Sequence, residues 1–229
     1  MTLRINDEAP NFFADTTEGA ITFHDWIGTS WVVFMSHPKD FTPICTTELG
    51  LMARLEGEFA RRNIKIIGHS VDSVDDHWRW MKDIMDTQGV KPTFPIIGDE
   101  QLNIAKLYDM LPADAVVDGR TLAENATIRA VFIIGPDKKI KLISFYPMSC
   151  GRNFYEVLRS IDSLQLTTKY KIATPVNWEP GDAVIIPPSV SDDDATRLFP
   201  QGWTTTKPGG GPESQQRPYL RYVELPKQN

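Results

Sequence analysis

Cysteine is scarce in this chain, whose 229 residues include two, Cys45 and Cys150. Two thiols are too few for the disulfide framework of a small secreted protein. The sequence also has no CxxC pair of the kind used by thioredoxin-type redox centres and many structural zinc sites. We therefore expect no disulfide scaffold, no metal and no other cofactor. A lone thiol in such a chain is either a small apolar core residue or a reactive group.

The chain also lacks a long apolar run and an excess of positive charge. No stretch approaches the roughly 18 apolar residues of a membrane-spanning helix, and the start, MTLRINDEAP, lacks the apolar segment of a signal peptide. The formal net charge of −6 and the pI near 5.3 argue against nucleic acid and anionic membranes as partners. We expect a cytoplasmic protein that binds neither.

What the sequence does contain is an alternation of strand-like and helix-like segments. The expected strands are residues 31–36, 65–70, 94–97, 127–134 and 139–145, and the expected helices begin near residues 43, 73, 101 and 153. The last two strands flank the turn sequence GPDK and should pair as a hairpin. This order predicts an α/β fold, in which a mainly parallel sheet with an antiparallel hairpin has helices on both faces.

Apolar spacing predicts the buried face of three helices. The first should bury Ile44, Leu51, Met52, Leu55 and Phe59, the second Trp78, Met81, Ile84 and Met85, and the last Phe154, Val157, Leu158, Ile161 and Leu164. Ser73 with Asp76 reads as a capping box that opens the second of these helices.

The composition changes after residue 166, where nine of the seventeen prolines and a Gly209-Gly210-Gly211 run occur. We expect a domain over residues 1–166 and an appended arm over 167–229, with the glycine run as a turn rather than a phosphate site. The arm has many large apolar residues, which we expect to be exposed and to cover a second copy in a homodimer. They are Trp178, Ile185, Ile186, Phe199, Trp203, Tyr219 and Tyr222. The stretch PYLRYVEL, residues 218–225, alternates like a strand that could join its own sheet or a neighbour's.

Cys45 falls at the expected start of a helix. Thr42 suits the N-cap and Pro43 the first helical position, which places Cys45 third in the first turn. Unpaired backbone N–H groups there carry partial positive charge and stabilise a thiolate. The alternative is a cysteine that only fills the core.

The stretch SHPKDFTPICTTELG resembles the active-site loop of peroxiredoxins, P-x-x-F-T-x-x-C-x-x-E, with Pro38, Phe41, Thr42, Cys45 and Glu48 in register. The stretches IRAVFIIGPDKKIKL, GRNFYEVLRS and ATPVNWEPGD extend the resemblance over almost the whole chain. Together they are similar to the one-cysteine, peroxiredoxin-6-like branch of the AhpC/TSA superfamily. The resemblance implies a thioredoxin-like core, a C-terminal extension that helps to form a dimer, and reduction of hydroperoxides.

The resemblance also implies roles for individual residues. The Cys45 thiolate would attack the peroxide, Thr42 would place its hydroxyl between sulfur and peroxide, Pro38 would shield the thiolate from water, and Arg129 would contact both thiolate and substrate. The residues themselves also support this role of Arg129, because a guanidinium in the buried-strand pattern TIRAVFII needs an anion nearby. Its alternative is an edge-strand arginine that points to water.

Three further residues match the family near this site. His37 would lie close to the sulfur, or it would be a half-buried histidine held by hydrogen bonds. Arg152 would be a second arginine near the pocket, or a surface cation ahead of a helix. Glu48 would order the arginines by ion pairing rather than transfer protons.

Thr174 stands where two-cysteine relatives carry the resolving thiol, in TPVNWEPG. The resemblance thus implies that an external thiol, of the glutathione or thioredoxin type, reduces the oxidised Cys45. Cys150 is expected to be a small semi-buried residue, although an unconventional resolving role stays open.

Two other functions stay open. A peroxide sensor or holdase could use the same Cys45. Some members of the branch also hydrolyse phospholipids, and their Ser-His-Asp set maps to Ser30, His24 and Asp137. The local sequence GTSWV departs from the G-x-S-x-G pattern of those members at Val32, and Thr29 replaces an acidic residue.

Overall fold

The computed structural model describes residues 3–113, 115, 126–205 and 217–225. The predicted Gly209-Gly210-Gly211 turn lies outside these residues. The chain divides into two compact units, Met1–Phe154 and Tyr155–Asn229. No described helix is both long enough and apolar enough to cross a bilayer.

The first unit is built on a mixed seven-stranded sheet in the order β2-β1-β5-β4-β3-β6-β7. The strands are β1 (Phe13–Thr16), β2 (Gly19–Thr22), β3 (Trp31–Ser36), β4 (Ile64–Ser70), β5 (Ile96–Gly98), β6 (Arg129–Ile134) and β7 (Ile140–Tyr146). Strands β3, β4 and β5 are parallel, whereas β6 and β7 form an antiparallel hairpin beside β3. This is the thioredoxin-like α/β fold that the sequence predicts. The N-terminal hairpin of β1 and β2 is an addition that the sequence analysis did not predict.

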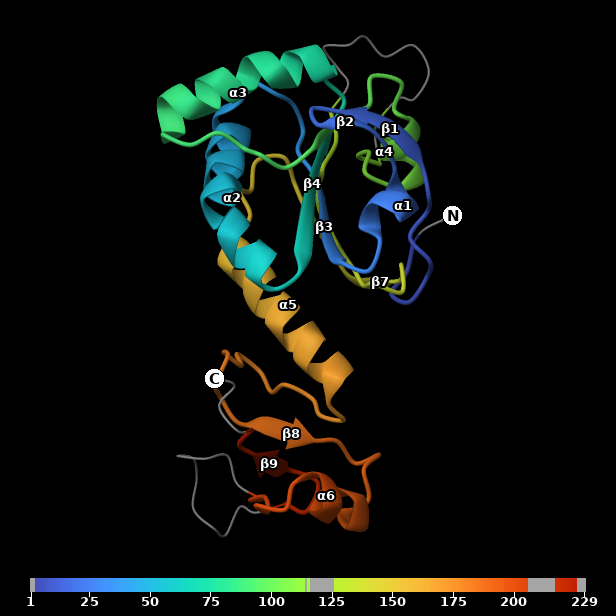
Figure 1. Cartoon of the computed structure of the whole chain (residues 1–229), viewed down its shortest axis with the longest axis vertical. Helices are drawn as coiled ribbons and strands as arrows, with labels where there is room; N and C mark the ends of the chain where they lie inside the picture. The colour runs from blue at the N-terminus through green and yellow to red at the C-terminus, as the bar shows by residue number, and fades with distance from the viewer. Residues whose placement is uncertain (1–2, 114, 116–125, 206–216, 226–229) are drawn as a thin grey trace. The chain divides into compact units, whose positions relative to one another are not determined.

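Helices cover both faces of this sheet. They are α1 (Phe23–Ile27), α2 (Pro43–Arg61), α3 (Val74–Gln88) and α4 (Asn103–Leu107). Figure 1 shows α2 and α3 on one side of β3 and β4, and α1 and α4 on the other. All residues of β3 are buried, as its uninterrupted apolar run predicts for a strand covered on both faces. The C-terminal end of β3, which precedes α2, therefore lies in the protein interior.

The buried face of α3 differs from the predicted one. Ser73 caps α3 by accepting the Asp76 backbone N–H, as expected. However, Trp78 is 40% exposed and Met85 is 50% exposed, and the residues that face inward are His77, Trp80, Met81 and Ile84. The prediction failed because it rested on apolar spacing alone and therefore left His77 out. The His77 side chain is fully buried and hydrogen-bonded, so the inward face includes it at helical spacing.

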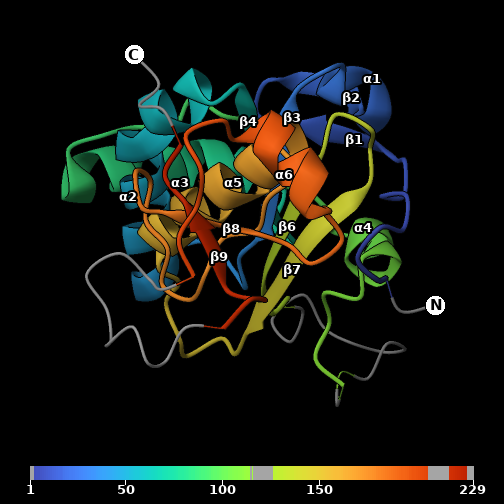
Figure 2. The same cartoon turned by 90° about the horizontal axis from the view of Figure 1, so that it is seen from below.

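The second unit contains most of α5 (Phe154–Lys169), together with β8 (Val184–Ile186), α6 (Asp192–Leu198) and β9 (Arg221–Val223). Phe154, Val157, Leu158 and Ile161 of α5 are buried, as predicted. Figure 2 shows β8 and β9 side by side, and the two strands pair antiparallel. The strand-like stretch near residue 221 thus pairs within its own chain.

The large apolar residues of the arm are less exposed than the sequence led us to expect. Trp178, Ile186 and Phe199 are buried in a cluster inside the second unit, whereas Tyr219 is 61% exposed. Pairing of β8 with β9 and the packing of α6 give these side chains an internal partner. Their number in the sequence is therefore not by itself a sign of a subunit interface.

Candidate active site

Cys45 lies in the first turn of α2 and is fully buried. Thr42 is the N-cap residue in extended conformation and Pro43 is the first helical residue, which makes Cys45 the third. The sulfur therefore sits in the turn whose backbone N–H groups lack helical partners. Both cysteines of the chain are free thiols.

Arg129 begins β6 and is 2% exposed. Because β6 pairs with β3, this end of β6 lies beside the segment that leads into α2. The Nη1 atom of Arg129 lies 3.3 Å from Sγ of Cys45, and Nε donates to the Met148 carbonyl at 2.9 Å. The guanidinium thus meets the sulfur from the sheet side, in the interior of the first unit.

Glu48 joins two arginines at this place. It lies one turn after Cys45 on α2, and Oε2 accepts from Arg129 Nη1 at 2.8 Å and from Arg152 Nη2 at 2.7 Å. Its Oε1 accepts from the backbone N and Nε of Arg152. Burial by itself would raise the pKa of Glu48, but the charge and hydrogen bonds of Arg152, together with the Arg129 charge, hold the pKa below its usual value.

The Arg152 side chain donates hydrogen bonds to Glu48 and to the backbone carbonyls of Ser36 and Ala130. Arg152 therefore holds Glu48 in place against the ends of β3 and β6. Arg129 is the arginine that contacts the sulfur. Two guanidinium groups and one carboxylate leave this buried cluster with an excess of one positive charge. A thiolate on Cys45 brings the cluster to neutrality, which is the arrangement that a low-dielectric site favours.

Pro38 and Thr42 both precede Cys45, in the loop that leads into α2. Pro38 is buried and Thr42 is half-buried. The Thr42 hydroxyl donates to the Lys39 carbonyl at 2.9 Å and does not cap α2, but its oxygen still has lone pairs that can accept.

His37 has a partner that the sequence analysis did not find. Its Nε2 lies 2.7 Å from Oδ1 of Asp40, and Oδ2 of Asp40 lies 2.6 Å from Nδ1 of His77. All three side chains are buried. Hydrogen bonds from both histidines outweigh the effect of burial and hold the pKa of Asp40 below its usual value. The one sequence signal for this cluster was a histidine at the inward spacing of α3.

The His37–Asp40–His77 cluster also has the residue types of a metal site. Its ligand atoms are already engaged, because each carboxylate oxygen of Asp40 is hydrogen-bonded to one imidazole and Nε2 of His77 faces the Ile97 carbonyl at 3.0 Å. The carboxylate occupies the space between the two rings where an ion would have to bind. The geometry therefore fits a hydrogen-bonded triad rather than a metal centre.

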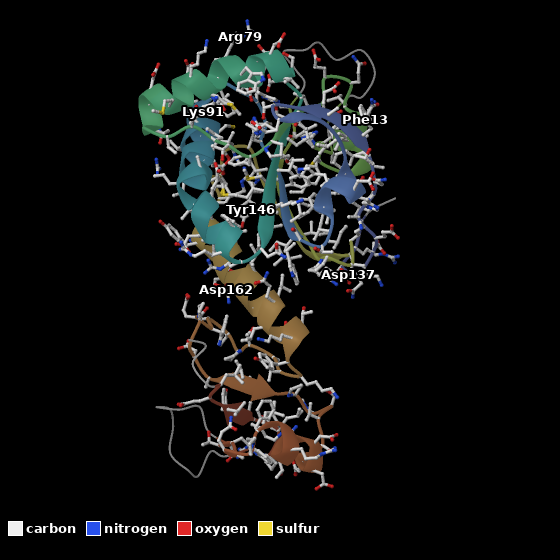
Figure 3. All side chains as sticks on the ribbon, in the orientation of Figure 1. Phe13, Arg79, Lys91, Asp137, Tyr146 and Asp162 are labelled. Atoms are coloured by element: carbon white, nitrogen blue, oxygen red, sulfur yellow. The ribbon has the colours of Figure 1, made fainter. Side chains whose placement is uncertain are left out.

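Ser30, His24 and Asp137 lie at the opposite end of β3 from Cys45. The turn that carries Asp137 follows β6, and the β3–β6 register brings it to the end where β3 begins (Figure 3). The hydrogen bonds of the three residues go elsewhere: Ser30 to Asn63, His24 Nε2 to the Ala9 carbonyl, and Asp137 to Lys141 and the Lys139 amide. This arrangement does not join them into a Ser-His-Asp relay.

Cys150 is exposed, not semi-buried as expected, and lies on the turn that follows β7. The same turn supplies the Met148 carbonyl to Arg129, and a Cβ added to Gly151 would lie 3.5 Å from Cγ2 of Ile44. Cys150 is therefore near the site along the chain, but the structure shows no bond between the two thiols.

Comparison with known proteins identifies the family of both parts of the chain. The AhpC/TSA family matches residues 5–143, and the C-terminal domain of 1-Cys peroxiredoxin matches residues 163–202. Peroxiredoxin-6 of Gallus gallus is 50% identical over 230 residues, which cover 98% of each chain.

Solved structures agree. The C45S mutant of the peroxiredoxin 6 of Arenicola marina is 46% identical, with a TM-score of 0.86 over 99% of this chain and 100% of its own. A yeast mitochondrial 1-Cys peroxiredoxin, studied for a thiol resolving mechanism via glutathione/thioredoxin systems, is 49% identical, with a TM-score of 0.84 over 98% of this chain and 100% of its own.

Proposed function

The chain belongs to the AhpC/TSA family and is a thiol peroxidase of the 1-Cys peroxiredoxin type with Cys45 as its peroxidatic cysteine, and we propose how its residues carry out the reaction. The observation that supports the proposal most is the 3.3 Å contact of Arg129 with the sulfur inside a buried, hydrogen-bonded cluster.

In the first step the Cys45 thiolate attacks one oxygen of a hydroperoxide, ROOH. The S–O bond forms as the O–O bond breaks, and the departing alkoxide or hydroxide takes up a proton to leave as ROH or water. The sulfur becomes a sulfenic acid, Cys45–SOH, and the peroxide is reduced by two electrons.

Arg129 and Thr42 are placed to assist this displacement. The fixed charge of Arg129 stabilises the thiolate before the reaction and the negative charge on the peroxide oxygens during it. The half-buried Thr42 hydroxyl can hold the peroxide in line with the sulfur, and buried Pro38 keeps water from the thiolate. Glu48 and Arg152 fix the position of Arg129 and contribute their charges to the buried cluster.

We infer that an external thiol completes the cycle. It attacks the sulfenic sulfur and releases water, and a second thiol then frees Cys45 as the donor pair becomes a disulfide. Thr174 offers no thiol for this step, and the yeast relative was studied with glutathione and thioredoxin systems. Whether this protein uses either donor is tested by supplying each in turn, with ascorbate as a third, and following peroxide consumption.

A homodimer and a cytoplasmic location are further proposals. The dimer is supported by the exposed apolar residues that remain on the second unit, such as Val176 and Tyr219, and is tested by sedimentation equilibrium. The location is supported by the low number of cysteines, both of them free thiols, although one similar yeast protein is mitochondrial, and is tested by fractionating cells.

A further inference from the structure

Asp40 is the residue through which the first unit holds the loop ahead of Cys45. It lies between β3 and α2, and its backbone N–H donates to Oδ2 of Asp72 at 2.8 Å. Its carboxylate oxygens are bonded to His37, at the end of β3, and to His77 on α3. Three segments of the fold thus fix one residue that is 3% exposed.

The next residue, Phe41, adopts a backbone conformation that needs such support. Its φ is +56°, in the left-handed region that bulky side chains avoid. The Phe41 side chain is 52% exposed, so burial of its own ring gives only part of that support. Strain of this kind persists where the neighbouring residues impose it.

The residues after Phe41 are tied down as well. The Thr42 hydroxyl reaches back over Phe41 to the Lys39 carbonyl, and the Thr42 carbonyl accepts from the backbone N–H of Thr46. Trp80 Nε1 donates to the Thr46 hydroxyl at 3.1 Å. Since His77 and Trp80 are one turn apart, a single face of α3 bonds both the loop and the first turn of α2.

The partners of His77 define its protonation. Nδ1 faces a carboxylate oxygen of Asp40 and Nε2 faces the Ile97 carbonyl, and neither oxygen can donate. Both nitrogens therefore carry hydrogen, which makes His77 an imidazolium paired with the Asp40 carboxylate.

We propose that Asp40 and His77 are positioning residues for peroxide reduction: their buried ion pair keeps Phe41 left-handed and thereby holds the first turn of α2, with Cys45, in the conformation that reacts. The inference rests on the proposed peroxidase role of Cys45. The hydrogen bonds of the two residues go to His37, Asp72, Ile97 and each other, so their effect on the rate passes through the loop.

This positioning depends on pH. Burial disfavours the charged form of His77, but the hydrogen bond and charge of Asp40 outweigh it, and the pKa of His77 is raised above its usual value. The charge of Asp72 also raises the pKa of His77. Two other histidines lie near this pair: His37, whose ring is next to that of His77, and the neutral His69, which is bonded to Asp99. The ion pair is complete below the raised pKa and is lost as pH rises through it.

The test is the second-order rate constant of Cys45 with hydrogen peroxide, measured by stopped flow from about pH 6 to about pH 10. Asp40→Asn should lower this constant by about tenfold or more, as expected when a reacting atom is misplaced. His77→Leu should do the same. His77→Asn keeps an N–H group near the position of Nδ1, so it should restore most of the rate and lack the alkaline decline of the wild type.

Hydrogen exchange gives a readout independent of activity. The amide of Thr46, which is bonded to the Thr42 carbonyl, should exchange faster in Asp40→Asn and His77→Leu. Asp86→Asn makes the same chemical change at an exposed site of α3 and should match the wild type in both measurements.

The outcomes separate this inference from the proposed function. If the wild type reduces no peroxide, the proposed function fails, and unchanged exchange at Thr46 would then sink the positioning role too. If the wild type is active but Asp40→Asn and His77→Leu react at its rate, or if His77→Asn keeps the alkaline decline, the positioning role is wrong and the peroxidase role stands.

Discussion

The Nη1 atom of Arg129 lies 3.3 Å from Sγ of Cys45 and 2.8 Å from Oε2 of Glu48. One nitrogen is thus shared between the sulfur and a carboxylate that is itself held by Arg152. The position of the charge beside the sulfur therefore depends on Glu48 and Arg152 as well as on Arg129 itself.

Arg129→Lys should lower kcat/KM for hydrogen peroxide by about a hundredfold, the usual size of losing one fixed donor at a developing charge. A lysine keeps the charge but cannot reach the sulfur, Glu48 and the Met148 carbonyl together. Steady-state peroxide consumption measures the effect. Arg79→Lys, at an exposed position of α3 visible in Figure 3, should leave kcat/KM unchanged. Equal rates for Arg129→Lys and the wild type would refute the role of the guanidinium.

Glu48→Gln should lower the free energy of unfolding by about 3 kcal/mol, because it leaves two buried guanidinium groups without their carboxylate. Urea denaturation followed by circular dichroism measures the change. The same substitution at Glu58, which pairs with arginines on the surface of α2, should have little effect. A loss no greater than that of Glu58→Gln would show that the cluster contributes little to stability.

Two buried histidines should give the free energy of unfolding a maximum near neutral pH. Burial outweighs the Asp99 interaction and lowers the pKa of His69, so stability falls as pH drops below the ordinary value of 6.5. Asp40 raises the pKa of His77, so its contribution falls as pH rises through that raised pKa. Each slope is at most about 1.4 kcal/mol per pH unit. Denaturation curves at several pH values measure both, and His69→Gln should flatten the acid side alone. A profile whose acid side is unaltered in His69→Gln would contradict this assignment.

Cys150→Ser should retain the wild-type rate of peroxide consumption with an added thiol, because the exposed Cys150 is not bonded to the site. Mass spectrometry of the peroxide-treated wild type under non-reducing conditions should find Cys45 as sulfenic acid or its further oxidation products. A disulfide between Cys45 and Cys150 would instead make Cys150 a resolving residue.

The sequence predicted the core of the first unit because its signals there are local. The apolar run 31–36, the Thr42-Pro43 helix start and the Gly135-Pro136 turn each reflect one backbone element, and each element is found at that place. The N-terminal hairpin β1–β2 was not predicted, since these two short strands have mostly exposed or half-exposed residues and give little apolar contrast.

The sequence could not reveal contacts between residues far apart in the chain. Asp40 and His77 are 37 positions apart, and a buried hydrogen-bonded histidine looks like a surface residue when apolar spacing is the only guide. For the same reason Arg129 could be expected to need an anion, while its sharing of Glu48 with Arg152 required the fold. The resemblance to a known family named the site residues but not this geometry.

The central claim, that Arg129 and the first turn of α2 hold the sulfur of Cys45 as the thiolate that attacks peroxide, is tested most directly by the ultraviolet absorbance of the thiolate. The band is recorded for Cys150→Ser under the conditions of the peroxide assay, with the Cys45→Ser/Cys150→Ser double variant as blank. We predict a band that weakens in Arg129→Lys. Absence of the band, or an equal band in Arg129→Lys, would contradict the account.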